Sequence, residues 1–366
     1  MAYNISVIYG DGIGQEIVDQ AIKVMNEVGN VFHHTFHFER CEAGTEAVQK
    51  YGEPLPDKSL RQCQESDAIL LGSLWLDHYP ELPQEKRPSY VLSLLRKKLQ
   101  LTINIRPISV YKSLADLSPL KNGIIGEGFN ILMLRDLAGG MLMSKRYRGI
   151  GDHGKEAFDT EYYNEEIIKA NACAAFEIAR GRSKKVTSLD KAVILESSKL
   201  WREVVQEVSA DYRDVSLVNQ YIDDAAAQVI TNPHNYDVIL TSGMFGDILS
   251  DEISALAGTP NVLPSAELNH QGKGLFTPNQ IHNKDYSIIG GDIANPIGSI
   301  LSGAMMLRFA FGLEKESQTI EKAVRQVLNE KYATKDICLP GSKRIGTSEM
   351  GSIISEKIRE IGKELV

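Results

Sequence analysis

Residues 235–258 read NYDVILTSGMFGDILSDEISALAG and join a strand pattern to a helix pattern. The apolar run at 238–240 is typical of a buried strand, and the residues after the turn place apolar side chains three and four apart. A second unit of this kind pairs NISVIYG (4–10) with GQEIVDQAIKVMNEV (14–28). Strands that alternate with helices in this way predict an α/β fold whose sheet is largely parallel.

The helix pattern of that stretch carries Asp247 and Asp251. Residues four apart lie on one face of an α-helix, so the two carboxylates are neighbours. They are either an acidic pair near a helix N-terminus, which the helix dipole favours, or two ligands of a hard divalent cation. The spacing alone favours the first interpretation, and a third aspartate from elsewhere in the chain would favour the second.

The totals exclude several classes of protein. The chain has 366 residues, 43% of them hydrophobic, and a net charge of −8, so it can fill more than one core and is not expected to bind nucleic acid. No apolar run approaches the roughly 20 residues of a membrane span, and the first residues lead directly into a strand, so we expect a cytoplasmic protein. The four cysteines are scattered, which indicates neither a zinc site nor a disulfide framework.

Three arginines interrupt or end apolar segments. Arg96 lies on a helix pattern, Arg106 precedes a proline that is expected to end a strand, and Arg135 follows another apolar strand. A single arginine of this kind is usually a surface residue. Three together are more typical of a carboxylate clamp, because the guanidinium fork matches a carboxylate.

Two further motifs carry candidate site residues. YGDGIGQE (9–16) joins a strand to a helix through glycines, but it is not the G-x-G-x-x-G fingerprint of a Rossmann fold. Lys191 follows Asp190 at the start of an apolar stretch that is expected to be a strand, and it is either a solvated lysine or a base whose pKa is lowered by burial or by a nearby cation. Asp223 and Asp224 begin an apolar helix pattern.

These motifs, in this order, resemble the β-decarboxylating dehydrogenases, the family of isopropylmalate and isocitrate dehydrogenases. The resemblance runs nearly from end to end and is stronger to the isopropylmalate branch. Its motifs are GDGIGQE, LLRKKLQLTINIRP, RDLAGG, DKAVILE, YID, FGDILSDE, GGDIANPIGSILSGAMMLR and GTSEMG.

The resemblance implies an isopropylmalate dehydrogenase-like, doubly wound α/β fold of two domains, with a mixed and largely parallel sheet, which is not an ordinary Rossmann fold. Residues 1–101 and 258–366 would form the dinucleotide-side domain, and residues 102–257 the dimerisation and metal-side domain. An arm is expected near 141–165, where the sequence is polar and contains glycine. The family also implies a homodimer with shared active sites.

The resemblance also assigns roles to particular residues. It implies that Arg96, Arg106 and Arg135 bind the carboxylates of a malate-type substrate, with Leu92 and Ser93 near its substituent. Mg²⁺ or Mn²⁺ would be bound by Asp247 and Asp251, with Asp223 and the base Lys191 supplied by the partner subunit. The nicotinamide cofactor, NAD ahead of NADP, would contact Ile13, His282, Ser287 and Asn295.

The chain departs from the family pattern at several places. Leu142 stands where the family has the tyrosine that protonates the enol, so solvent, Ser144 or Tyr147 would have to replace it. Val193 replaces an asparagine after the lysine, and Trp75 lies in a loop that is normally Gly-Gly-Pro.

The adenosine loop departs as well. Thr277 and Ser287 stand where the family has acidic residues, and Lys284 or Tyr286 could instead meet a 2′-phosphate, so the choice of dinucleotide is open.

Three functions are compatible with this pattern. The first is metal-dependent, NAD(P)-linked oxidative decarboxylation of a 3-substituted malate. The second is a non-redox, metal-dependent lyase that keeps the malate clamp. The third is a non-catalytic paralogue that binds a carboxylate ligand, which would leave the lysine and the three aspartates without a reason.

Overall fold

The computed structural model describes residues 1–75, 79–279 and 286–365. The chain divides into two compact units. The first unit comprises Met1–Leu101, Tyr111–Pro119 and Ala257–Val366, and the second comprises Thr102–Val110 and Leu120–Leu256. The roles of dinucleotide side and dimerisation side expected for the domains stay a prediction.

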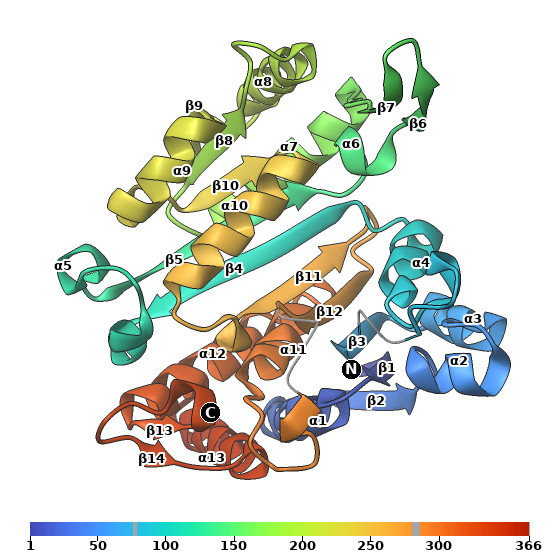
Figure 1. The fold of residues 1–366 in the computed structure, drawn as a ribbon. Helices are drawn as coiled ribbons and strands as arrows, with labels where there is room; N and C mark the ends of the chain where they lie inside the picture. Colours follow the sequence, from blue (N-terminus) through green and yellow to red (C-terminus); the bar gives the residue numbers. More distant parts are fainter. Residues whose placement is uncertain (76–78, 280–285, 366) are drawn as a thin grey trace. The chain divides into compact units, whose positions relative to one another are not determined.

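Five strands of the first unit lie side by side. Their spatial order is β2 (Thr35–Arg40), β1 (Ala2–Gly10), β3 (Ala68–Ser73), β12 (Gly274–Pro278) and β11 (Pro264–Leu268), as Figure 1 shows. Of these, β3, β11 and β12 are almost entirely buried. β1 is parallel to β2 and β3, and β12 is parallel to β3. Only the β11–β12 pair among these pairings is antiparallel, so the mixed, mostly parallel arrangement predicted from the sequence is confirmed.

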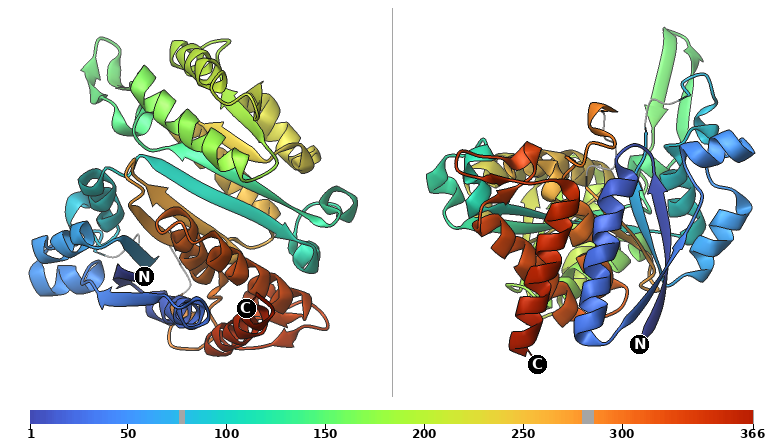
Figure 2. Two further views of the ribbon diagram at one scale, coloured as in Figure 1. Left: turned by 180° about the vertical axis from the view of Figure 1, so that it is seen from behind. Right: turned by 90° about the horizontal axis from the view of Figure 1, so that it is seen from below.

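Helices cover both faces of these strands (Figure 2). One face carries α2 (Thr45–Tyr51), α3 (Asp57–Glu65) and α4 (Tyr90–Leu99), and the other carries α1 (Gly14–Phe32), α11 (Ile297–Phe309), α12 (Glu314–Asn329) and α13 (Thr347–Leu365). Ile69 and Leu71, two apart on β3, join one buried cluster with Val91 and Leu95 of α4. Because strand side chains alternate between faces, Leu70 points to the opposite layer, and all of β3 is buried.

The second unit repeats this layered plan with five more strands. Their order is β4 (Ile103–Tyr111), β5 (Gly128–Asp136), β10 (Val238–Thr241), β8 (Lys185–Asp190) and β9 (Ser216–Tyr221). β10 is parallel to β5 and β8, and β8 is parallel to β9. The helices are α5 (Asn122–Ile125), α6 (Gly140–Met143), α7 (Glu165–Arg180), α8 (Glu196–Ser209), α9 (Ile222–Thr231) and α10 (Gly243–Leu256).

Short elements complete the chain. They are the strand pair β13 (Tyr332–Ala333) and β14 (Lys343–Arg344) and the 3₁₀ turns Gln84–Lys86, Lys112–Leu117, Pro233–Asn235, Pro260–Val262, Tyr286–Ile288 and Lys335–Ile337. The sequence predicts that a strand ends at Pro107, which is wrong, because β4 continues to Tyr111. The fixed φ of proline fits an extended backbone, and only its missing N–H limits it in a sheet.

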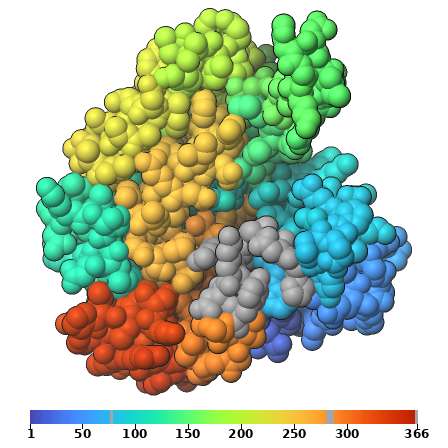
Figure 3. Space-filling model, in the orientation of Figure 1, coloured from blue at the N-terminus to red at the C-terminus, as the bar shows by residue number. Residues whose placement is uncertain are grey.

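The polar segment at 141–165 contains an antiparallel hairpin of β6 (Arg146–Gly151) and β7 (Gly154–Asp159). Figure 3 shows this hairpin, in green, standing out from the second unit. Its apolar side chains are exposed rather than buried: Ile150 is 81% exposed and Phe158 is 57% exposed. The ring of Tyr147 stacks on that of Phe158 with 5.2 Å between the centroids.

Helix α10 packs closely against the strands because it carries glycine at position 246. A Cβ at Gly246 would lie 2.8 Å from Cγ of Arg135 and 2.8 Å from Cγ2 of Thr241. Both contacts are shorter than carbon atoms tolerate, so a larger residue would displace α10 from β5 and β10. This close approach places the next residue, Asp247, beside Arg135.

We therefore expect Gly246→Ala to destabilise the protein by about 1–3 kcal/mol, because overpacking outweighs the helix propensity of alanine. Gly123→Ala is the matched control: it also lies in a helix of the second unit, and a Cβ there meets nothing within 4 Å. The control should be neutral or more stable by up to about 1 kcal/mol. Equilibrium urea unfolding of both variants measures this, and a Gly246→Ala variant as stable as the unsubstituted protein would contradict the packing argument.

Candidate active site

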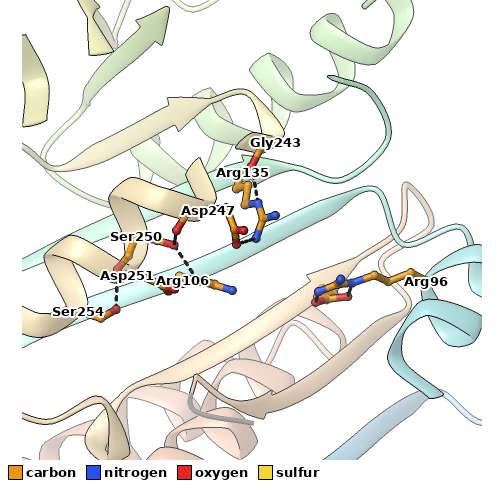
Figure 4. A network of polar contacts seen from close by, with 9 residues as sticks. Arg96, Arg106, Arg135, Gly243, Asp247, Ser250, Asp251 and Ser254 are labelled. Atoms are coloured by element: carbon orange, nitrogen blue, oxygen red, sulfur yellow. Dashed lines mark hydrogen bonds and ion pairs between the residues drawn. The ribbon is translucent and has the colours of Figure 1, made fainter. Parts of the chain in front are cut away.

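The centre of the candidate site is a buried arginine at the end of β5. Arg135 pairs in register with Thr241 of the parallel strand β10, and its side chain is only 4% exposed. Its Nε donates to the backbone oxygen of Gly243 at 2.7 Å, and its Nη1 donates to Oδ1 of Asp247 at 2.5 Å (Figure 4). A guanidinium this deeply buried must be paired, so the start of α10 and Asp247 are held to β5.

A second arginine makes a similar contact one helical turn further along α10. Arg106 of β4 donates through Nη1 to Oγ of Ser250 at 2.7 Å and to Oδ1 of Asp251 at 3.0 Å (Figure 4). Its Nε is buried and has no hydrogen-bond partner among the described residues.

Asp247 and Asp251 therefore lie on one face of α10, and in each of them Oδ1 accepts a hydrogen bond from an arginine. Their side chains are 49% and 74% exposed, and the second carboxylate oxygen of each has no protein partner in the described parts of the chain. Carboxylate oxygens are the ligands that Mg²⁺ and Mn²⁺ prefer. The donor set fits two ligands of a hard divalent cation.

Among the described residues, Asp247 and Asp251 do not form part of a larger group of metal-ligating side chains. Across residues 1–75, 79–279 and 286–365, no three His, Cys, Asp or Glu side chains gather into a group that could hold a metal ion. Asp223 instead lies in the first turn of α9 and pairs with Lys191. A third carboxylate for the α10 pair would thus have to come from outside this grouping.

The expectation that a strand starts at Lys191 is wrong, because β8 ends at Asp190 and a turn follows it. Lys191 and Asp223 meet where the parallel strands β8 and β9 end. Nζ of Lys191 lies 2.6 Å from Oδ1 of Asp223. The hydrogen bond from the Lys191 ammonium lowers the pKa of Asp223 below its usual value. The lysine is 22% exposed, and the aspartate is 66% exposed. The pair is open to a ligand on the side of the aspartate.

Arg96, the third arginine of the expected clamp, lies in the first unit and has a carboxylate partner there. Its Nε and Nη2 donate to the two oxygens of Glu267 on β11 at 2.8 and 2.5 Å. Glu267 is 3% exposed, so this bidentate pair balances a buried charge. Nothing local in the sequence indicates Glu267 as the partner, because it lies 171 positions after Arg96.

The other predicted binding residues lie at scattered places in the first unit. Leu92 packs against the buried cluster beneath α4, and Ser93 is exposed. Ile13 precedes the first turn of α1, and Ser287 is exposed in a 3₁₀ turn. His282 and Lys284 lie outside the described residues.

Asn295 is occupied by structural contacts. Its Nδ2 donates to Asp336 at 3.1 Å, and its Oδ1 accepts from the backbone N–H of Ile297 at 3.0 Å, which begins α11. Its assignment to a cofactor therefore stays a prediction.

The structure also describes the residues at which the chain departs from the family pattern. Leu142, at the expected tyrosine position, lies on α6 and is 41% exposed. Val193 is 62% exposed. The indole of Trp75 packs on the glycine turn before α1, where Nε1 would lie 2.9 Å from a Cβ at Gly12. Thr277 is buried and donates to the backbone oxygen of Gly72 at 3.3 Å.

A buried polar group beneath α6 was also missed by the sequence analysis. Asp136, next to Arg135, accepts hydrogen bonds from the backbone N–H groups of Ala138 and Gly139 and from Asn171. Burial nevertheless raises the pKa of this carboxyl. The Arg-Asp dipeptide at the end of an apolar strand was the only signal in the sequence.

Comparison with known proteins agrees with this fold. A family model described as isocitrate/isopropylmalate dehydrogenase matches residues 4–354. The 3-isopropylmalate dehydrogenase of Clostridium acetobutylicum is 46% identical over 352 residues, which are 96% of this chain and 98% of that protein. The 3-isopropylmalate dehydrogenase of Thermotoga maritima is 46% identical over 358 residues, covering 98% and 99%.

Solved structures give the same result. The isocitrate dehydrogenase of Methylococcus capsulatus has a TM-score of 0.80 at 30% identity, covering 98% of this chain and 99% of that one. A β-decarboxylating dehydrogenase of Thermococcus kodakarensis has a TM-score of 0.81 at 31% identity, covering 98% and 97%.

Fold and relatives together define an α/β enzyme of the decarboxylating-dehydrogenase type. The chain belongs to the isocitrate/isopropylmalate dehydrogenase family, as the order of its motifs predicted. None of the helices in the described ranges combines the length and apolar character needed to cross a membrane.

Proposed function

We propose that this chain catalyses the metal-dependent, NAD(P)-linked oxidative decarboxylation of a 3-substituted malate. Family membership supports oxidative decarboxylation of a hydroxy acid. The observation that supports a metal and a malate-type substrate is the α10 face. On this face Asp247 and Asp251 are each oriented by an arginine, and each keeps an oxygen for a ligand. A face with carboxylates and buried guanidinium groups suits a metal together with an anionic substrate.

Mg²⁺ or Mn²⁺ bound to these aspartates would supply positive charge to the substrate hydroxyl and to the enolate, and NAD, ahead of NADP, would accept the hydride. The residues of the chain do the rest. Arg106 and Arg135 orient the substrate carboxylates through donors aimed at the α10 face.

In this proposal the Lys191 ammonium first loses a proton to solvent by way of Asp223, and the neutral amine then takes the hydroxyl proton of the substrate. Lys191 is bound to the exposed Asp223, which can pass the proton on to solvent. The family arrangement, in which a partner subunit supplies Lys191 and Asp223, supports a homodimer. The exposed apolar hairpin β6–β7 and the absence of a third carboxylate beside the α10 pair among the described residues fit that arrangement. The same proposal places the enzyme in the cytoplasm.

One observation favours a second candidate function. Leu142 cannot donate a proton, and the indole of Trp75 covers Gly12 in the turn that the family resemblance assigns to the dinucleotide. A metal-dependent lyase or a carboxylate-binding paralogue would need the carboxylates of the α10 face. It would need neither a proton donor at position 142 nor an open dinucleotide turn at Gly12. Both alternatives predict no reduction of NAD or NADP with any 3-substituted malate.

Asp247→Asn tests the proposal. With Mn²⁺, NAD and a series of 3-alkylmalates, we expect the unsubstituted enzyme to form NADH and CO₂ in equal amounts. The variant should fall to about 1% of that turnover or less, because an amide neither balances Arg135 nor binds the metal as a carboxylate does.

Glu252→Gln is the matched control for Asp247→Asn. Glu252 lies on the same helix five residues after Asp247, so the helical repeat turns it away from the Asp247 face. Unchanged turnover in Asp247→Asn would refute the site, and equal loss in both variants would show that the effect is not specific to it.

Leu142→Tyr tests the missing proton donor. If enol protonation limits the reaction, we expect turnover to rise about tenfold or more, because a positioned general acid contributes at least that much. Met143→Tyr, one residue further and 59% exposed, is the control and should change little. An unchanged rate in Leu142→Tyr would mean that another group, such as Ser144 or Tyr147, already supplies the proton.

A further inference from the structure

Lys191 has a buried carboxylate as its immediate neighbour in the sequence. Asp190 ends β8 and is 1% exposed. Its Oδ1 accepts from the backbone N–H of Ala192 at 2.9 Å, which shapes the turn that carries Lys191. A buried carboxylate next to a lysine would normally capture the ammonium, because an unpaired buried charge is costly.

Asp190 is instead paired with Arg202 of α8. Nε and Nη2 of Arg202 donate to Oδ2 and Oδ1 of Asp190 at 2.8 and 2.9 Å, a bidentate pair that satisfies both oxygens. α8 is held to the same strand by Trp201, whose Nε1 donates to Oγ of Ser188 at 3.1 Å. The position of Arg202 is therefore fixed by the core of the second unit.

Tyr221 connects this pair to the lysine. It lies opposite Asp190 in the β8–β9 register. The guanidinium carbon of Arg202 lies 4.9 Å from the centre of its ring, and Nζ of Lys191 lies 5.8 Å from the same centre. Both cations use one aromatic ring, as cation–π geometry allows, and the lysine extends past the ring to Asp223.

We propose that Arg202 is a positioning residue for Lys191. By occupying Asp190, Arg202 leaves Asp223 as the carboxylate that Lys191 can reach, and the ring of Tyr221, which both cations approach, directs the ammonium toward it. This inference rests on the proposed function for the assignment of Lys191 as base, but the side-chain arrangement can be tested without turnover.

Three variants test the proposal. In Arg202→Met, Asp190 is left without its partner and should draw Lys191 inward. In Asp190→Asn/Arg202→Met, the charge that attracts the lysine is removed, and Lys191 should return to Asp223. Arg202→Lys keeps a cation on Asp190, so its effect on Lys191 should lie between those of Arg202→Met and the unsubstituted protein. It replaces Arg202→Met in the experiment if that variant fails to fold.

The matched control is Arg180→Met. Arg180 pairs with Asp214 through Nε and Nη2, and its guanidinium carbon lies 4.5 Å from the ring of Tyr212. It is thus an arginine of the same unit with the same two kinds of partner. We expect Lys191 to behave in this variant as in the unsubstituted protein.

The first readout is the rate at which an amine-acylating reagent labels Lys191 at fixed pH, measured by peptide mass spectrometry. We expect labelling to slow about fivefold or more in Arg202→Met, because the ammonium moves to a carboxylate that is buried rather than exposed. The double variant should recover the original rate.

The second readout is the split between kcat and KM. We expect kcat to fall about 10–100-fold in Arg202→Met with KM changed little, because misplacing a reacting group affects the chemical step more than substrate binding. In the double variant we expect kcat to recover to within about threefold of the unsubstituted value. Because that variant still lacks the Arg202–Asp190 ion pair, recovery would show that Arg202 positions Lys191 and is not merely structural.

Two results would overturn the inference: Lys191 labelled equally fast in Arg202→Met and Arg180→Met, or a double variant as impaired as Arg202→Met. If the unsubstituted chain turns over no malate, the proposed function fails, and the labelling experiment still decides the role of Arg202.

Discussion

The guanidinium of Arg135 is the group on which the second unit depends. It is buried at the end of a central strand, where an unpaired charge would be strongly destabilising, and its partners are the first turn of α10 and the carboxylate of Asp247. Gly246 is required for this contact, because any side chain there would push the helix away. One constraint thus fixes the packing of α10 and the direction of the carboxylates on its exposed face.

Arginines that pair with a carboxylate and fix its direction occur more than once in the second unit. Arg106 orients Asp251, Arg202 holds Asp190, and in each case the arginine is more buried or more constrained than an ordinary surface residue. Departures from the family are concentrated at other places: Leu142 on α6, and Trp75 on the glycine turn before α1. The residues that we propose for metal and malate keep the motifs of the family, whereas the positions that we propose for protonation and dinucleotide binding depart from them.

Local patterns predicted much of this arrangement. The strand–turn–helix units, the largely parallel sheets and the shared face of Asp247 and Asp251 follow from periodicity, and the order of motifs identified the family. What periodicity could not give were pairs far apart in the sequence, such as Arg96 with Glu267, because nothing local marks a buried partner 171 residues away. Pro107 misled the sequence analysis, since a proline that usually ends a strand is tolerated within β4.

The central claim is that Asp247 and Asp251 form a metal and malate site coupled to a dinucleotide site. The most direct measurement is the thermal shift of the unsubstituted protein with Mn²⁺, a 3-alkylmalate, NAD and NADP, each alone and in combination. We expect metal and malate together to stabilise more than the sum of each alone, and NAD to add a further shift. Stabilisation by metal and malate without any response to either dinucleotide would contradict the redox function, and no response to metal plus malate would contradict the site itself.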